Sequence, residues 1–225
     1  MHQFGEILVK RQISWQDVTH EQCQQICKQI IKTIAPKLQN EILLSSNRYR
    51  HLLQRIEQLS IDSLMRLVEF AKHSEFSPKA LEQDFGANSS MPPLLFTDED
   101  NHKIEIIGQI DRIDFNDNYY LVIDYKSGNA FINLLQVYYG LKLQLLTYLL
   151  VAQNTTLQLY NMENAIPAGI LYCFLKTPII TGTNKLSVQQ IKTEIEKKMR
   201  MPGWILADPE IIKKLMTLLI SSKYV

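Results

Sequence analysis

Apolar residues recur at intervals of three and four through the first third of the chain. One such pattern follows Thr19 and runs to about residue 34, and Gln22 stands where it can complete a capping box with Thr19. A longer pattern runs from about Ser46 to His73. Because each pattern presents a single apolar face, we predict two amphipathic helices that face a core.

The pattern becomes that of strands from about residue 76. The segment to Phe85 is short and extended, and a loop rich in Gly, Asn, Ser and Pro follows it. Two runs rich in Ile, Val and Tyr, Lys103–Phe115 and Tyr119–Lys126, flank three consecutive Asn and Asp residues, which tolerate a positive φ. We predict an antiparallel hairpin from these two runs.

Three further segments complete the pattern. Helical periodicity covers Leu134–Ala152, a β-rich run covers Gly169–Leu175, and a charged amphipathic helix is predicted for Ser187–Met199. The order, helices followed by β-β-α-β-α, is typical of an α/β protein. We predict one domain over 1–225, with a helical part over about 1–75 and a sheet-containing core over about 76–225.

Composition narrows the class of protein. At 225 residues and 46% hydrophobic, the chain can bury one core. The net charge of +1 gives no overall attraction to nucleic acid, so any DNA binding must come from a local groove. Three cysteines without a signal peptide indicate reduced thiols in a cytoplasmic protein. No apolar run approaches the roughly 20 residues of a membrane span, which favours a soluble protein without a membrane partner.

Charges interrupt the apolar hairpin at a few positions. Strand side chains alternate between faces, so Asp124 and Lys126 project to the same side. A two-residue turn would place Asp111 directly opposite Asp124, with the two Cβ atoms about 4.5 to 5.5 Å apart. Facing carboxylates in an apolar sheet are unfavourable unless a cation neutralises them, and Mg²⁺ prefers carboxylate oxygens. The spacing therefore predicts a metal site.

Such a site suits phosphodiester hydrolysis. The metal would polarise a phosphoryl oxygen and activate a water, while Lys126 would orient that water or stabilise charge on the phosphorus. Glu82 lies in a short apolar segment and is a candidate third acidic group. Gln144 and Tyr148 stand four residues apart, on one face of the helix after the hairpin, and are candidates to meet the same phosphate.

Structural explanations compete with these assignments. Asp111 could pair with Arg112, Asp124 could form an exposed ion pair with Lys126, and the Gln and Tyr of the helix could cap the core edge. We interpret Arg112 and Asp114 as structural or solvent-facing, because a regular strand places them opposite Asp111. Apolar residues on both faces of the second strand favour burial, where unpaired charge is costly, and this favours the functional interpretation.

The hairpin and the helix after it resemble the RecB-type motifs of the PD-(D/E)XK nucleases. The flanking sequence, including Pro167–Tyr172, is most similar to the AddB family, the B subunits of bacterial helicase-nucleases, and this similarity covers nearly the whole chain. The resemblance implies a restriction-endonuclease-like mixed sheet flanked by helices, with an N-terminal helical part. It rests on Gly108-x-Ile-Asp111-Arg-Ile-Asp114, Val122-Ile-Asp124-Tyr-Lys126-Ser127 and Tyr139-Gly-Leu-x-Leu-Gln144-x-x-x-Tyr148.

The resemblance also implies a cofactor and a set of site residues. The family uses Mg²⁺, for which Mn²⁺ can substitute. The family's metal ligands match Asp111 and Asp124, with His2 near the place of a helical histidine, and its remaining catalytic groups match Lys126, Glu82, Gln144 and Tyr148.

By the same resemblance, the chain is a DNA exonuclease subunit that works with an AddA-like helicase-nuclease subunit on the 5′-ended strand at double-strand breaks. Family members hold an iron-sulfur cluster, but Cys23, Cys27 and Cys173 do not match its cysteines, so we expect an excised domain or a cluster-lacking relative. The sequence carries no phosphate loop for ATP. Two other hypotheses stay open: a DNA-binding or structural module that is inactive without its partner, and a nuclease of a phage or CRISPR-associated system.

Overall fold

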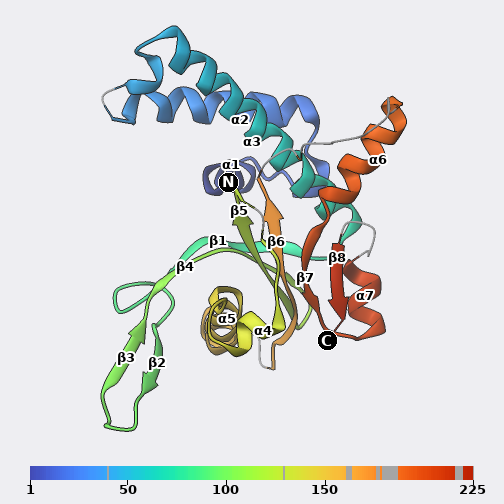
Figure 1. The fold of residues 1–225 in the computed structure, drawn as a ribbon. Coiled ribbons are helices and arrows are strands. Elements are labelled where there is room, and N and C mark those ends of the chain that lie inside the picture. Colours follow the sequence, from blue (N-terminus) through green and yellow to red (C-terminus); the bar gives the residue numbers. More distant parts are fainter. Residues whose placement is uncertain are drawn as a thin grey trace. The chain divides into compact units, whose positions relative to one another are not determined.

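The computed structural model describes residues 1–39, 41–128, 130–160, 164–175, 178, 187–215 and 220–224 (Figure 1). It divides into two compact units. One unit is formed by Met1–His73 and Leu175–Lys198, and the other by Ser74–Phe174 and Met199–Val225. The single domain over 1–225 stays a prediction.

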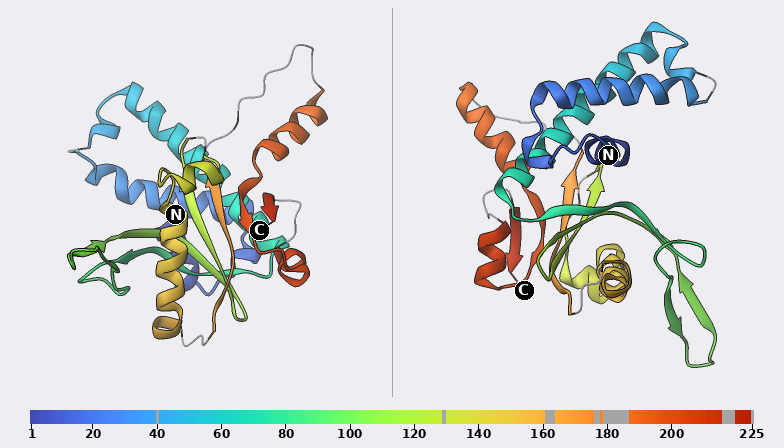
Figure 2. Two further views of the ribbon diagram at one scale, coloured as in Figure 1. Left: turned by 60° about the horizontal axis from the view of Figure 1, so that its bottom comes forward. Right: turned by 180° about the vertical axis from the view of Figure 1, so that it is seen from behind.

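The first unit is helical, as its apolar periodicity predicts. Thr19 caps α2: its Oγ1 accepts from the Gln22 amide at 3.2 Å, and Gln22 Oε1 accepts from the Thr19 amide at 2.9 Å. Both predicted helices are confirmed, and they pack side by side (Figure 2). The described helices of the first unit are α1 (His2–Lys10), η1 (Trp15–Asp17), α2 (His20–Ile34), η2 (Ala35–Lys37), η3 (Ile42–Leu44), α3 (Asn47–His73) and α6 (Val188–Lys198).

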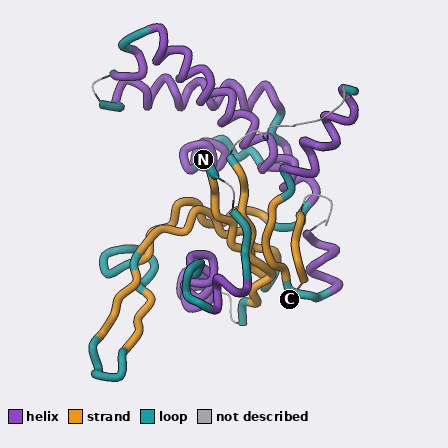
Figure 3. Tube along the Cα trace, in the orientation of Figure 1, coloured by secondary structure: helices purple, strands orange, loops and turns teal. Residues whose placement is uncertain are grey.

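The second unit is built on a six-stranded mixed sheet, shown as orange strands in Figure 3. The strand order is β1-β4-β5-β6-β7-β8, with β5–β6 and β7–β8 parallel and the other neighbours antiparallel. This confirms the predicted mixed α/β fold. The strands are β1 (Ser77–Phe85), β4 (Gly108–Asn116), β5 (Tyr119–Lys126), β6 (Ile166–Phe174), β7 (Met201–Ile205) and β8 (Ile220–Tyr224).

The β4–β5 hairpin has the predicted register. Asn116 pairs with Tyr119 and Arg112 with Ile123, so the turn contains two residues. Asp117 adopts a positive φ of 48° there, which Asp tolerates better than most residues do. The turn thereby fixes which side chains of the two strands face each other.

Helix α5 (Gln144–Tyr160) packs on β5 and β6, and its apolar side chains join those of the sheet in the core. The helical periodicity predicts one helix over Leu134–Ala152. This prediction is wrong, because α4 (Leu134–Tyr138) ends before Gly140, whose φ of 73° is incompatible with a continuing helix. A short helix, α7 (Pro209–Leu215), follows β7.

The predicted strand over Lys103–Phe115 is likewise two strands. Its first part, β3 (Lys103–Ile106), pairs with β2 (Leu94–Thr97) instead of the main sheet. The break falls at Ile107, directly before Gly108, where an added Cβ would lie 2.9 Å from the Phe85 ring. We call the β2–β3 pair the arm, and Figure 1 shows it extending away from the six-stranded sheet.

Candidate active site

Two carboxylates face each other across the β4–β5 hairpin. The register continues from Arg112–Ile123 to place Asp111 opposite Asp124. Here the Asp111 side chain approaches the neighbouring strand, and its Oδ2 accepts a hydrogen bond from the Tyr125 amide at 2.6 Å. Asp111 is therefore held by backbone, whose geometry does not depend on a flexible side chain.

Burial changes the ionisation of the two aspartates. Asp124 is 1% exposed and Asp111 is half-buried. Desolvation raises the pKa of Asp111, the Tyr125 amide lowers it, and the nearby Asp124 carboxylate raises it further. Desolvation also raises the pKa of Asp124, which the Lys126 ammonium partly offsets. Both carboxylates are therefore harder to ionise than free Asp, and a cation would favour their ionised forms.

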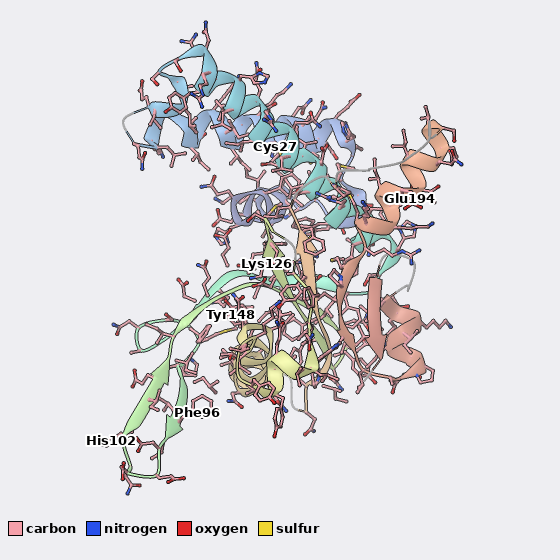
Figure 4. The ribbon with its side chains drawn as sticks, in the orientation of Figure 1. Cys27, Phe96, His102, Lys126, Tyr148 and Glu194 are labelled. Atoms are coloured by element: carbon pink, nitrogen blue, oxygen red, sulfur yellow. The ribbon has the colours of Figure 1, made fainter. Side chains whose placement is uncertain are left out.

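Lys126 links the carboxylates to helix α5. Its Nζ lies 2.6 Å from Asp124 Oδ2 and donates to Gln144 Oε1 at 2.8 Å. The Gln144 amide nitrogen in turn donates to the Tyr148 hydroxyl at 2.8 Å. Figure 4 shows Lys126 and Tyr148 near one another in the second unit. The four predicted residues thus form one continuous chain of polar contacts.

Glu82 belongs to the same neighbourhood. Its place between the pairs Leu81–Arg112 and Gln83–Ile110 sets it opposite Asp111, and its charge contributes to the raised pKa of Asp111. Glu82 has a φ of 48°, unusual for a residue other than Gly within a strand. Such a conformation costs of order 1 kcal/mol, and strained backbone of this kind within regular structure clusters at functional sites.

The opposite face of the hairpin carries a different ion pair. Arg112 Nε lies 2.6 Å from Asp114 Oδ1, Arg112 Nη2 lies 2.7 Å from Asp114 Oδ2, and both side chains are fully buried. The prediction that they are structural is therefore supported, but a solvent-facing position is wrong. The pair also excludes Arg112 as the partner of Asp111, because its donors point to the other side of the strand.

Tyr172 is a neighbour of the site that sequence analysis missed. It pairs with Asp124 across the parallel β5–β6 ladder, and its ring centroid lies 5.7 Å from Lys126 Nζ. Desolvation raises the pKa of Tyr172, with a contribution from the Asp124 charge. The contact depends on parallel pairing between strands about forty residues apart, for which the sequence gives no local signal.

His2, the remaining predicted ligand, lies in α1 of the first unit. Its Nε2 is 3.3 Å from Glu6 Oε1, one helical turn away. Its role as a metal ligand stays a prediction. The three cysteines are buried and form no disulfide bond, and among the described residues none belongs to a group of possible metal ligands.

One group of possible ligands lies on the arm, at its tip. The side chains of Asp98, Asp100 and His102 offer ligand atoms within 4.8 Å of one another, and all three are exposed. Asp98 organises the turn: its carboxylate accepts from the amides of Asp100 and His102 and lies 2.9 Å from His102 Nδ1. These contacts account for the cluster as a capped turn. Figure 4 shows His102 far from Lys126.

The acidic residues on β1, β4 and β5 fit a divalent cation better than the cluster on the arm does. Three carboxylates, Glu82, Asp111 and Asp124, face one ammonium group, Lys126, so the ionised acids leave an excess of negative charge. Carboxylate oxygens are hard ligands that suit divalent cations. Lys126 forms its close ion pair with Asp124, so it does not neutralise all three acids. The donor set is thus compatible with a metal between the two aspartates.

Comparison with protein families agrees with this geometry. Residues 1–215 match the family model described as the PD-(D/E)XK nuclease superfamily. The chain belongs to this superfamily. Its members are metal-dependent nucleases, so the predicted enzyme class is confirmed at the level of the family.

Curated relatives are named as the B subunit of an ATP-dependent helicase/deoxyribonuclease. The chain is 37% identical to that of Clostridium novyi (strain NT) over 217 residues, 36% identical to that of Bacillus cereus (strain G9842) over 220 residues, and 37% identical to that of Alkaliphilus oremlandii (strain OhILAs) over 219 residues. These matches cover 95 to 96% of this chain and 19% of each relative. The resemblance to the AddB family is thereby confirmed, and the chain spans about a fifth of the length of these relatives. Of the helices that the structure describes, none has the length and apolar character needed to span a bilayer.

Proposed function

We propose that this superfamily member is the DNA-cleaving domain of an AddB-type subunit and hydrolyses phosphodiester bonds with Mg²⁺ or Mn²⁺. The observation that carries the proposal is the contact chain from Asp124 through Lys126 and Gln144 to Tyr148, beside Asp111. It joins an acidic pair suited to a cation with an ammonium group suited to a phosphate. DNA is the proposed substrate because the relatives are named as parts of a deoxyribonuclease.

Each side chain has a distinct role in this mechanism. Asp111 and Asp124 would hold the cation, which would supply Lewis acidity toward a phosphate oxygen. Lys126 donates to the attacking water or to a non-bridging oxygen and stabilises the charge that develops there. Gln144 fixes the Lys126 ammonium group at 2.8 Å, so little reorganisation is needed during reaction.

Glu82 and Tyr148 are two further residues of the candidate active site. Glu82 adds negative charge next to Asp111 and would thereby stabilise the bound cation. Tyr148 accepts from the Gln144 amide, which leaves its own hydroxyl proton available to a phosphate oxygen. His2 is proposed as a further ligand, on the family resemblance alone.

The cellular setting is proposed from the relatives' names. The name of a B subunit implies a partner, and we propose an AddA-like helicase-nuclease subunit in the cytoplasm. The complex would resect double-strand breaks for recombinational repair, with this domain degrading the 5′-ended strand. The iron-sulfur cluster of the family would be held by cysteines other than Cys23, Cys27 and Cys173.

Cleavage of labelled linear single-stranded DNA tests the proposal. The chain should cleave with Mg²⁺ or Mn²⁺ and lose cleavage in EDTA, and Lys126→Ala should lower the rate by about 100-fold or more. Lys103→Ala, on the exposed arm, is the matched control and should cleave normally. Activity retained by Lys126→Ala, or unaffected by EDTA, would contradict the assignment.

Calorimetry separates the two groups of acids. Mg²⁺ binding should be lost in Asp111→Asn and Asp124→Asn and kept in Asp98→Asn, which alters the capped turn of the arm. The reverse pattern would move the metal to the arm. Metal binding without cleavage by the unaltered chain would instead indicate a module that is inactive without its partner.

A further inference from the structure

The segment between the two halves of the site has a particular placement. Residues 127–143, here called the site loop, leave β5 directly after Lys126 and enter α5 directly before Gln144. Lys126 and Gln144 are joined by a 2.8 Å hydrogen bond, so this bond closes the base of the loop. Whatever binds the site loop is therefore bound next to the reacting groups.

The described part of the site loop is ordered by its own hydrogen bonds. Asn133 Oδ1 accepts from the amides of Leu135 and Gln136 and begins α4. The Leu141 amide donates to Gln136 O at 2.8 Å and closes the far end. A platform held in this way loses little conformational entropy when a ligand binds to it.

Two aromatic rings stand out from this platform. Tyr138 is 82% exposed and Tyr139 is 66% exposed. Their ring centroids are 5.3 Å apart with an interplanar angle of 80°, so the two rings present faces in different directions. Exposed aromatic faces beside a phosphate-binding site are the arrangement on which unpaired bases stack.

The charge of the segment suits a polyanion. No acidic residue occurs from Tyr125 to Met162, although the chain has 23 Asp and Glu in all. Within the site loop, Lys142 Nζ lies 4.1 Å from the centroid of the Phe131 ring and is held there by a 3.4 Å contact with Phe131 O. The site loop thus offers a DNA strand a positive charge and no carboxylate of its own.

We propose that Tyr138 and Tyr139 form a base-stacking subsite that holds single-stranded DNA beside the candidate active site. The inference rests on the proposed function and deepens it by assigning the substrate-holding residues. Gln144 follows Tyr139 by five positions, which limits their Cα separation to about 18 Å. The subsite thus engages nucleotides within a few positions of the phosphate that is cut.

Exposed leucines also lie on the site loop, and they would suit an apolar polypeptide instead. Leu134, Leu135 and Leu141 are each more than half exposed. The lack of acidic residues and the closure of the loop by two site residues favour DNA over a protein partner. The test is designed so that these two occupants give different results.

The experiment measures binding of a fluorescent oligo(dT) by anisotropy in EDTA, where a metal-dependent enzyme leaves it intact. Tyr138→Ala and Tyr139→Ala should each weaken binding roughly 5- to 100-fold. Tyr138→Phe and Tyr139→Phe keep the rings and should bind as the unaltered chain does. Phe96→Ala removes an exposed ring from the arm and is the matched control.

Two further readouts identify stacking as the cause. An oligonucleotide with abasic positions should bind the unaltered chain about as weakly as normal DNA binds the Ala variants. The Ala variants should bind the abasic oligonucleotide with the same affinity as the unaltered chain does. The dependence of affinity on salt should not change in the variants, because stacking releases no counterions.

Unchanged affinity in both Ala variants would overturn the subsite and leave the loop as a polypeptide contact. An equal loss on normal and abasic DNA would also overturn it. If the unaltered chain cleaves DNA through Lys126 in either case, the proposed function stands while the subsite fails.

Discussion

The buried ion pair between Arg112 and Asp114 allows a quantitative test of the fold. Arg112→Met keeps the length and apolar stem of the side chain but leaves the Asp114 carboxylate, 0% exposed, without its bidentate partner. Removing one partner of a buried pair typically costs about 3–5 kcal/mol. Because domains of this size are stable by about 5–15 kcal/mol, the variant should lose a large share of its stability.

The paired variant Arg112→Met/Asp114→Leu should recover much of this loss. Replacing both ions with apolar groups is often neutral or stabilising, since neither charge must then be desolvated. Arg112 also interacts electrostatically with the buried Tyr125 side chain, so part of the loss should remain in the double variant. Tyr125→Phe in the same background should remove this remaining cost.

Urea unfolding followed by tryptophan fluorescence measures these differences in the right part of the molecule. Trp204 lies in β7 of the second unit and Trp15 in the first unit, so a Trp15→Phe background makes the signal report on the sheet alone. Coincidence with circular dichroism checks that the transition is two-state. The reasoning would be refuted if Arg112→Met lowered the free energy of unfolding by less than about 1 kcal/mol. It would also be refuted if the loss in the double variant equalled the sum of the losses in Arg112→Met and Asp114→Leu.

Three more outcomes are expected. The raised pKas of Asp111 and Asp124 mean that, without metal, the contribution of these two groups to stability is most favourable below their usual pKa of 3.8 and falls as pH rises through the raised values. Mg²⁺ should offset this loss, and a melting temperature indifferent to Mg²⁺ at about pH 7 would contradict the expectation. Gly203→Ala should destabilise the sheet by at least about 2 kcal/mol in urea, because the new Cβ would overlap a β6 carbonyl oxygen, whereas Gly128→Ala meets nothing within 4 Å and should be neutral. Tyr172→Leu removes the ring near the site lysine and should lower kcat about two- to fivefold, while Tyr172→Phe should keep it; equal kcat values would count against the contact.

Local sequence rules were sufficient to predict the register of the β4–β5 hairpin and the positions of its site residues. A two-residue turn admits one register, and strand alternation then determines which side chains share a face. From these rules alone, Asp111 faces Asp124 and Lys126 stands beside Asp124, as the structure has them. The capping box at Thr19 is similarly local and was similarly predictable.

Features that depend on tertiary pairing could not be predicted in this way. The arm separates from β4 at Ile107, next to the close contact between Gly108 and Phe85 of β1, and no periodicity within Lys103–Phe115 indicates that contact. The strand over Met201–Ile205 pairs with β6, where its glycine allows close approach, but five residues with Pro and Gly resemble a loop when taken alone.

The two faces of the β4–β5 hairpin use charge in opposite ways. Arg112 and Asp114 neutralise each other within the core, and their geometry needs no other ion. On the other face, Lys126 contacts Asp124 at 2.6 Å while Asp111 accepts a hydrogen bond from a backbone amide, so negative charge is left over. Burial keeps that excess costly until a cation offsets it. Substitutions on the first face should therefore change stability with little effect on cleavage per folded molecule. Substitutions of the aspartates on the second face should abolish cleavage without the loss of stability expected of Arg112→Met. A folded Arg112→Met chain without cleavage would show that the two faces are coupled through the strand.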